Sequence, residues 1–145
     1  NPPSIVGAKS PRAKRRYARM AAWLRGEADE QQPWAPPGGT NHLSVDSLTQ
    51  AVLGALDRGE GGKAYLIGDE SLSYQDFFQR FVDLSGGTNT VTVRDASNPL
   101  QPDRFIVQGR GARIEYEPDS AETELLGYRR HDVARALAEA LTSTS

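Results

Sequence analysis

Apolar residues spaced three or four positions apart mark a series of amphipathic helices along the chain. This spacing places the apolar side chains on one helical face and leaves the other face to polar and charged residues. We expect helices at residues 11–25, 46–58, 73–85, 119–126 and 133–141.

Short apolar runs between these segments predict strands. The candidates are residues 5–6, 42–45, 64–67, 90–93 and 113–116, and the run AYLI at 64–67 has the length and flanks of a buried strand. Residues 27–40 are rich in proline, glycine and polar residues and predict a loop. The alternation of strands and helices indicates the α/β class.

Helix starts are marked by side chains that accept hydrogen bonds from the first turn. Ser10, followed by Pro11, predicts an N-cap with proline at the first helical position. We expect Asp46, Ser73 and Asp119 to cap the next three helices, and the last two each have an acidic residue three positions on.

The composition of the 145 residues is that of an ordinary globular domain. No apolar stretch is long enough to span a membrane, and no secretory signal is evident. The absence of cysteine fits a cytoplasmic protein. The chain opens as NPPSIVG, without Met and with the end of a strand, so we expect it to be a fragment of a longer protein.

The charge is unevenly distributed. Residues 9–25 contain seven basic and no acidic residues, so the rest of the chain, with ten basic and 19 acidic residues, carries −9. A basic helix at 11–25 raises the possibility of a nucleic-acid-binding module. A helix with one apolar stripe and solvated arginines explains the pattern better than nucleic-acid binding, because no stacking platform or DNA-binding motif accompanies the helix. Charge attraction to the acidic remainder, within the chain or across a homodimer, is a further alternative.

Several kinds of chemistry are excluded by the residues at hand. Two histidines without cysteine give no metal-site spacing, and no G-x-S-x-G nucleophile motif occurs. No G-x-x-G-x-x-G turn follows a strand, so the chain has no dinucleotide phosphate cradle. No tyrosine is followed four residues later by lysine.

Four motifs in order resemble the back half of the extended short-chain dehydrogenase/reductases, the NAD-dependent epimerase/dehydratase superfamily. They are NPPSIVG at residues 1–7, GGTNHLSVDSL at 38–48, GKAYLIG with LSYQDF at 62–77, and LLGY at 125–128. Residues 87–118 match the family pattern least.

The resemblance implies a single domain, residues 1–145, that forms the C-terminal portion of a Rossmann-type NAD(P)-binding fold. It would supply the last sheet strands and a small substrate-binding lobe, while the N-terminal dinucleotide-binding half of the same protein is absent. The implied activity is that of an NAD- or NADP-dependent oxidoreductase acting on a hydroxyl/carbonyl pair of a small-molecule substrate. Because the family's catalytic Tyr and Lys are missing, this chain completes a site and carries no catalytic residue of its own.

By the same resemblance, the loop that contains Pro2, Pro3 and Ser4 passes the nicotinamide ring of the cofactor. Two prolines restrict the backbone and would stiffen such a loop. An ordinary proline-rich exit from a strand is the structural alternative.

The resemblance also places Asn41 and His42 at the substrate. Trp34 lies among prolines, and an aromatic side chain suits the wall of an apolar substrate pocket. Nucleotide-sugar enzymes of the superfamily usually have a phosphate-binding Arg where this chain has Thr40, so we expect a neutral, apolar substrate. A histidine next to a strand is more often structural, and a tryptophan among prolines also serves to fix a loop. A non-catalytic member of the same fold, acting as a sensor or assembly subunit, is the competing hypothesis.

Overall fold

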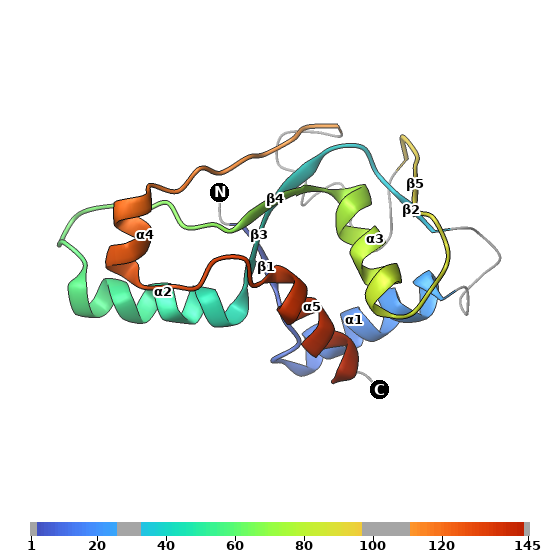
Figure 1. The fold of residues 1–145 in the computed structure, drawn as a ribbon, viewed down its shortest axis with the longest axis horizontal. Helices are drawn as coiled ribbons and strands as arrows, with labels where there is room; N and C mark the ends of the chain where they lie inside the picture. Colours follow the sequence, from blue (N-terminus) through green and yellow to red (C-terminus); the bar gives the residue numbers. More distant parts are fainter. Residues whose placement is uncertain (1–2, 26–32, 97–110, 144–145) are drawn as a thin grey trace.

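The computed structural model describes residues 3–25, 33–96 and 111–143 and has an α/β fold (Figure 1). Its elements, in chain order, are β1 (Ser4–Val6), α1 (Pro11–Leu24), β2 (Trp34–Ala35), β3 (Gly39–Ser44), α2 (Val45–Arg58), β4 (Glu70–Ser73), α3 (Tyr74–Leu84), β5 (Thr92–Val93), α4 (Ser120–Leu126) and α5 (Val133–Thr142).

The strands form two small sheets in the described part of the chain. In the first sheet β3 is central, with β1 parallel on one side and β4 antiparallel on the other; in the second, β2 pairs with β5 in parallel. Figure 1 shows α2 and α4 together on one side of the first sheet and α1, α3 and α5 together on the other. The sheet therefore separates two groups of helices.

The larger core lies among α1, α3 and α5. Ser10 caps α1, its Oγ accepting a hydrogen bond from the backbone N–H of Ala13 at 3.2 Å, and Ser73 caps α3 in the same way through Asp76 at 2.9 Å. Both caps confirm the sequence prediction. The fully buried large side chains of this core are Val6, Met20, Leu24, Phe78, Phe81, Val82, Val91, Val133 and Leu137.

A smaller core joins α2 and α4. It contains Leu43, Ala51, Leu126 and Tyr128. Helix α4 begins at its predicted N-cap, Asp119, and ends at Gly127, which has the left-handed conformation. The two helices approach so closely at Gly54 that an added Cβ would lie 1.9 Å from the carbonyl oxygen of Leu126. Only glycine fits there.

The start of α2 differs from the prediction. The N-cap is Ser44, whose Oγ accepts from the N–H of Ser47 at 3.0 Å, and Asp46 lies inside the first turn. Strand β3 keeps Ser44 extended up to the helix, so the cap falls at the strand's last residue. Asp46 instead forms an ion pair with Arg135 of α5 at 2.8 Å.

Three strand and loop predictions also need correction. Residues 64–67 are not a strand; β4 begins at Glu70, because only residues 70–73 find a ladder partner, in β3. Residues 113–116 make a single bridge, between Arg113 and Gly39. Within the predicted loop 27–40, Trp34 and Ala35 pair with β5, and β3 begins at Gly39. The first helix, predicted over residues 11–25, ends at Leu24.

Candidate functional site

Polar side chains line up across the three strands of the first sheet. Ser4 of β1 lies opposite His42 of β3, and His42 lies opposite Glu70 of β4. Residues in register on neighbouring strands point to the same face of a sheet. Ser4, predicted at the cofactor, is thus the direct neighbour of His42, predicted at the substrate.

His42 is covered completely by the rest of the chain. Its imidazole stacks on the phenyl ring of Phe77 in α3, with ring centroids 4.2 Å apart. Within the described residues, neither ring nitrogen has a hydrogen-bond partner. Burial, followed by the positive charges of Arg80 and Arg16, lowers the pKa of His42 to about 3. The ring is therefore neutral, with one N–H donor and one acceptor nitrogen.

Arg80 of α3, whose charge acts on His42, forms an ion pair with Glu70. Arg80 Nη1 donates to Glu70 Oε2 at 2.5 Å, which fixes the carboxylate at the end of the polar row. This ion pair is partly exposed, whereas His42 next to it is not. The polar row therefore consists of the half-buried hydroxyl of Ser4, the buried neutral ring of His42 and the carboxylate of Glu70. Arg80 neutralises the charge of this carboxylate.

Asn41 points to the opposite face of β3 and is fully buried. Its Oδ1 accepts from the N–H of Asp69 at 2.9 Å, and its Nδ2 donates to Ser71 Oγ at 3.1 Å. Both ends of the amide therefore bind the segment that enters β4. A substrate contact through Asn41, which stays a prediction, would compete with these bonds.

The remaining predicted site residues lie in different surroundings. Pro2 is outside the described residues; Pro3 is buried just before β1, and Thr40 is half-buried in β3. Trp34 lies in the second sheet, nearly buried, with the guanidinium of Arg94 5.7 Å from its ring centroid. The structure thus groups Pro3, Ser4, Asn41 and His42 on two neighbouring strands and places Trp34 in the other sheet.

A buried carboxylate that no sequence motif marked, that of Asp69, anchors the start of α5. Asp69 accepts hydrogen bonds from the backbone N–H groups of His131 at 2.7 Å and Asp132 at 2.9 Å, and Arg130 Nε donates to it at 3.3 Å. These bonds hold His131 in a left-handed conformation, with φ of 59°.

Asp132 extends the network to the end of β3. It accepts from Ser44 Oγ at 2.6 Å and from Arg135 Nε at 2.7 Å. The hydrogen bonds from Arg135 are the main reason that the pKa of Asp132 falls to about 2. No local sequence signal identifies this network, because 63 residues separate the two carboxylates.

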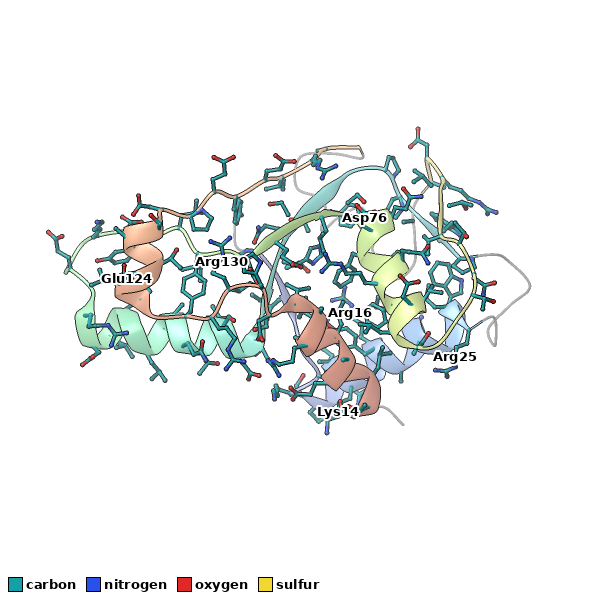
Figure 2. The ribbon with its side chains drawn as sticks, in the orientation of Figure 1. Lys14, Arg16, Arg25, Asp76, Glu124 and Arg130 are labelled. Carbon is teal, nitrogen blue, oxygen red and sulfur yellow. The ribbon has the colours of Figure 1, made fainter. Side chains whose placement is uncertain are left out.

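Three arginines of α1 lie on the side that faces away from the core. Tyr17, Met20 and Leu24 pack into the larger core, and Arg12, Arg15 and Arg19 repeat at helical spacing on the opposite side. Arg16 lies at the edge of the apolar stripe, and its charge acts on the buried His42. Figure 2 shows Lys14 and Arg25 at the outer rim of the molecule. The helix thus presents Arg12, Arg15 and Arg19 to solvent, and one apolar stripe attaches it to the core.

The described residues hold neither a metal-binding cluster nor a membrane-spanning helix. They contain no cluster of three or more His, Asp or Glu side chains able to hold a metal ion. None of the helices described there is long and apolar enough to cross a membrane.

No protein-family model matches the chain, and neither does any curated protein. Solved structures do match. The UDP-N-acetylglucosamine 4-epimerase of Bacillus cereus is 16% identical with a TM-score of 0.65, the match covering 98% of this chain and 46% of that one. The NADPH complex of RMD from Pseudomonas aeruginosa is 13% identical with a TM-score of 0.66, covering 97% and 46%.

A third match has a nucleotide and a cofactor in its structure. The UDP-glucose 4-epimerase of Bifidobacterium longum, in complex with NAD+ and UDP, is 19% identical with a TM-score of 0.61, covering 97% of this chain and 45% of that one. The chain spans less than half the length of each of these proteins. It therefore has the α/β fold of the C-terminal portion of Rossmann-type epimerase/dehydratase structures.

Proposed function

We propose that the chain is the substrate-side half of an NAD(P)-dependent oxidoreductase that acts on a hydroxyl/carbonyl pair of a small, apolar substrate. The observation that carries the proposal is the register of β1 and β3, which sets Ser4 beside His42. The fold supports it, since structural neighbours contain NADPH or NAD+.

In this proposal Pro3 and Ser4 form the wall against which the nicotinamide lies. Pro3 is buried, and its ring fixes the backbone immediately before β1. A stiff backbone beside a flat ring holds the reacting carbon in place. The nicotinamide would supply the hydride, and the proton would come from residues outside this chain.

The substrate is proposed to be apolar because the chain offers no phosphate clamp in β3. By the resemblance, Thr40 of β3 stands where nucleotide-sugar enzymes usually carry Arg, and Arg12, Arg15 and Arg19 of α1 are exposed to solvent. A diphosphate buried without a bidentate cation costs several kcal/mol in lost hydration. His42 would bind the substrate oxygen only if α3 moved away from its ring, because Phe77 covers it.

The test is a comparison of ligands on the complete gene product. We expect UDP and UDP-sugars not to bind the wild type, and Thr40→Arg to gain UDP binding, with Thr40→Gln as the uncharged control. UDP binding by the wild type would show that another cation holds the diphosphate and would refute the apolar substrate class.

A non-catalytic role remains the second candidate, since dinucleotide binding by this fold does not require turnover. It predicts that the complete gene product binds NAD(P)H without oxidising it in the presence of any carbonyl compound. Steady-state assays of NAD(P)H oxidation distinguish the non-catalytic role from the oxidoreductase.

A further inference from the structure

Three arginines on the outward face of α1 have no acidic partner in the described part of the chain. Arg12, Arg15 and Arg19 are exposed there without an ion pair or a hydrogen bond. From residue 33 onward the arginines of the described chain are held by the ring of Trp34, at Arg94, or by carboxylates, at Arg58, Arg80, Arg113, Arg129, Arg130 and Arg135. The outward face of α1, which we call the basic face, therefore presents three positive charges that the described chain does not neutralise.

These charges act against the helix that carries them. The first turn of α1 contains no acidic residue, and Arg12 lies at its second position, near the positive end of the helix dipole. Arg15 and Arg19 are four positions apart, and like charges at that spacing repel each other on a helix. An arrangement that costs helix stability without a contact in the described chain indicates an anionic partner.

The segment before α4 carries a matching row of carboxylates. Exposed and half-buried residues alternate over positions 111–119. The backbone N–H groups of Ile114 and Tyr116 donate to β3 and β4 at 3.0 and 3.2 Å, so the residues between them face outward. Three of the outward residues are acidic and form what we call the acidic row: Glu115, Glu117 and Asp119. Of these, Glu115 has only an exposed neighbour, Arg113, as its ion-pair partner, at 3.0 Å.

The basic face and the acidic row have similar lengths. The helix rises about 10 Å between Arg12 and Arg19, and an extended chain spans about 13 Å between Glu115 and Asp119. Three cations can therefore face three carboxylates in order. Figure 1 shows α1 and the segment before α4 on opposite sides of the molecule, so the two surfaces of one copy do not meet.

We propose that the chain associates head to tail, with the basic face of one copy bound to the acidic row of another. The contact joins two different surfaces, so it can add further copies or close into a ring. A net charge of −2 leaves little general repulsion between copies. A nucleic acid would also attract the basic face, but its phosphates would be repelled by the acidic row. The proposal goes beyond the proposed function and uses none of the residues assigned to cofactor or substrate.

Two charge-reversed forms of the complete gene product test the two surfaces separately. The helix-reversed form carries Arg12→Glu, Arg15→Glu and Arg19→Glu. The row-reversed form carries Glu115→Lys and Glu117→Lys, and leaves the cap of α4 unchanged. Each form is immobilised in turn, and the binding of both forms from solution is measured by biolayer interferometry. Melting temperatures show that the forms are folded, and acidic residues near the start of α1 should raise that of the helix-reversed form.

Each reversed form should fail to bind itself, because its two surfaces then carry charges of the same sign. The two forms should bind each other, because one keeps the acidic row and the other keeps the basic face. We expect this affinity to fall about tenfold or more between about 0.02 M and about 0.3 M salt, since salt screens exposed charges. Absence of binding between the two forms, or equal binding of each form to itself, would overturn the proposal.

A matched control reverses two exposed acidic residues outside the row, with Glu60→Lys and Asp83→Lys. It has the same net charge as the row-reversed form, and we expect it to bind itself as tightly as the wild type does. Loss of self-binding in this control would mean that net charge governs the association, and a wild type that does not bind itself in low salt would mean that the basic face has another partner. Either result would refute the head-to-tail contact.

Discussion

The imidazole of His42 and the phenyl ring of Phe77 stack with planes 6° apart, and this places both ring nitrogens of a histidine in the core without a partner among the described residues. A buried polar atom without a hydrogen bond costs about 1–3 kcal/mol. The stacked position suits a phenyl ring at least as well as an imidazole.

Replacing His42 by Phe should therefore stabilise the fold. We expect His42→Phe to raise the free energy of unfolding by about 1–3 kcal/mol, measured by urea denaturation at neutral pH. His131→Asn, which changes the exposed histidine at a left-handed position, should be close to neutral. A loss of stability in His42→Phe would mean that the ring nitrogens make a bond that the described residues do not reveal.

The same histidine predicts acid sensitivity. Its pKa is about 3 in the folded state and about 6.5 in the unfolded chain, so between these values the unfolded state binds the extra proton. With respect to His42, the free energy of unfolding should be constant above pH 6.5. Below that pH it should fall by about 1.4 kcal/mol per pH unit, down to pH 3. Asp132, whose pKa is lowered to about 2, adds to this loss only below about pH 4. Unfolding curves of His42→Phe should lack the slope between pH 6.5 and 4.

The buried carboxylate of Asp69 should be a strong determinant of stability. Asp69→Asn replaces an acceptor of two backbone N–H groups with an amide that also donates, and leaves Arg130 without its charge partner. We expect a loss of about 3 kcal/mol. Asp57→Asn, at an exposed carboxylate on α2, is the matched control and should change stability by less than about 0.5 kcal/mol.

Residues 1–145 alone should not bind NAD(H) or NADP(H). The pyrophosphate of a dinucleotide binds to a glycine-rich turn at a helix N-terminus, and the chain has no such sequence. Calorimetric titration of the isolated chain checks this. Micromolar affinity would contradict the proposed division of the site between this chain and a separate dinucleotide-binding half.

Local signals in the sequence predicted the helices well. The caps at Ser10, Ser73 and Asp119 follow from short-range hydrogen bonds and are found as expected. The cap of α2 was misplaced because Ser44 and Asp46 are both good caps, and the backbone of β3 decided between them.

Features that depend on distant partners were harder to predict. Residues 64–67 have the composition of a strand, but a strand exists only where a second strand supplies hydrogen bonds. A buried Asp such as Asp69 looks like any surface Asp in the sequence, because its partners lie 61 to 63 residues away. The adjacency of Ser4 and His42 likewise required the register of β1 and β3.

The most direct test of the proposed function is the rate at which the complete gene product oxidises NADH or NADPH with apolar ketones or aldehydes. We expect turnover in the wild type, and a loss on the order of 10²-fold in Pro3→Gly from a misplaced nicotinamide, with a melting temperature only slightly lowered. Pro118→Gly, in the segment before α4, should keep the wild-type rate. Absence of turnover in the wild type, or an unchanged rate in Pro3→Gly, would contradict the account.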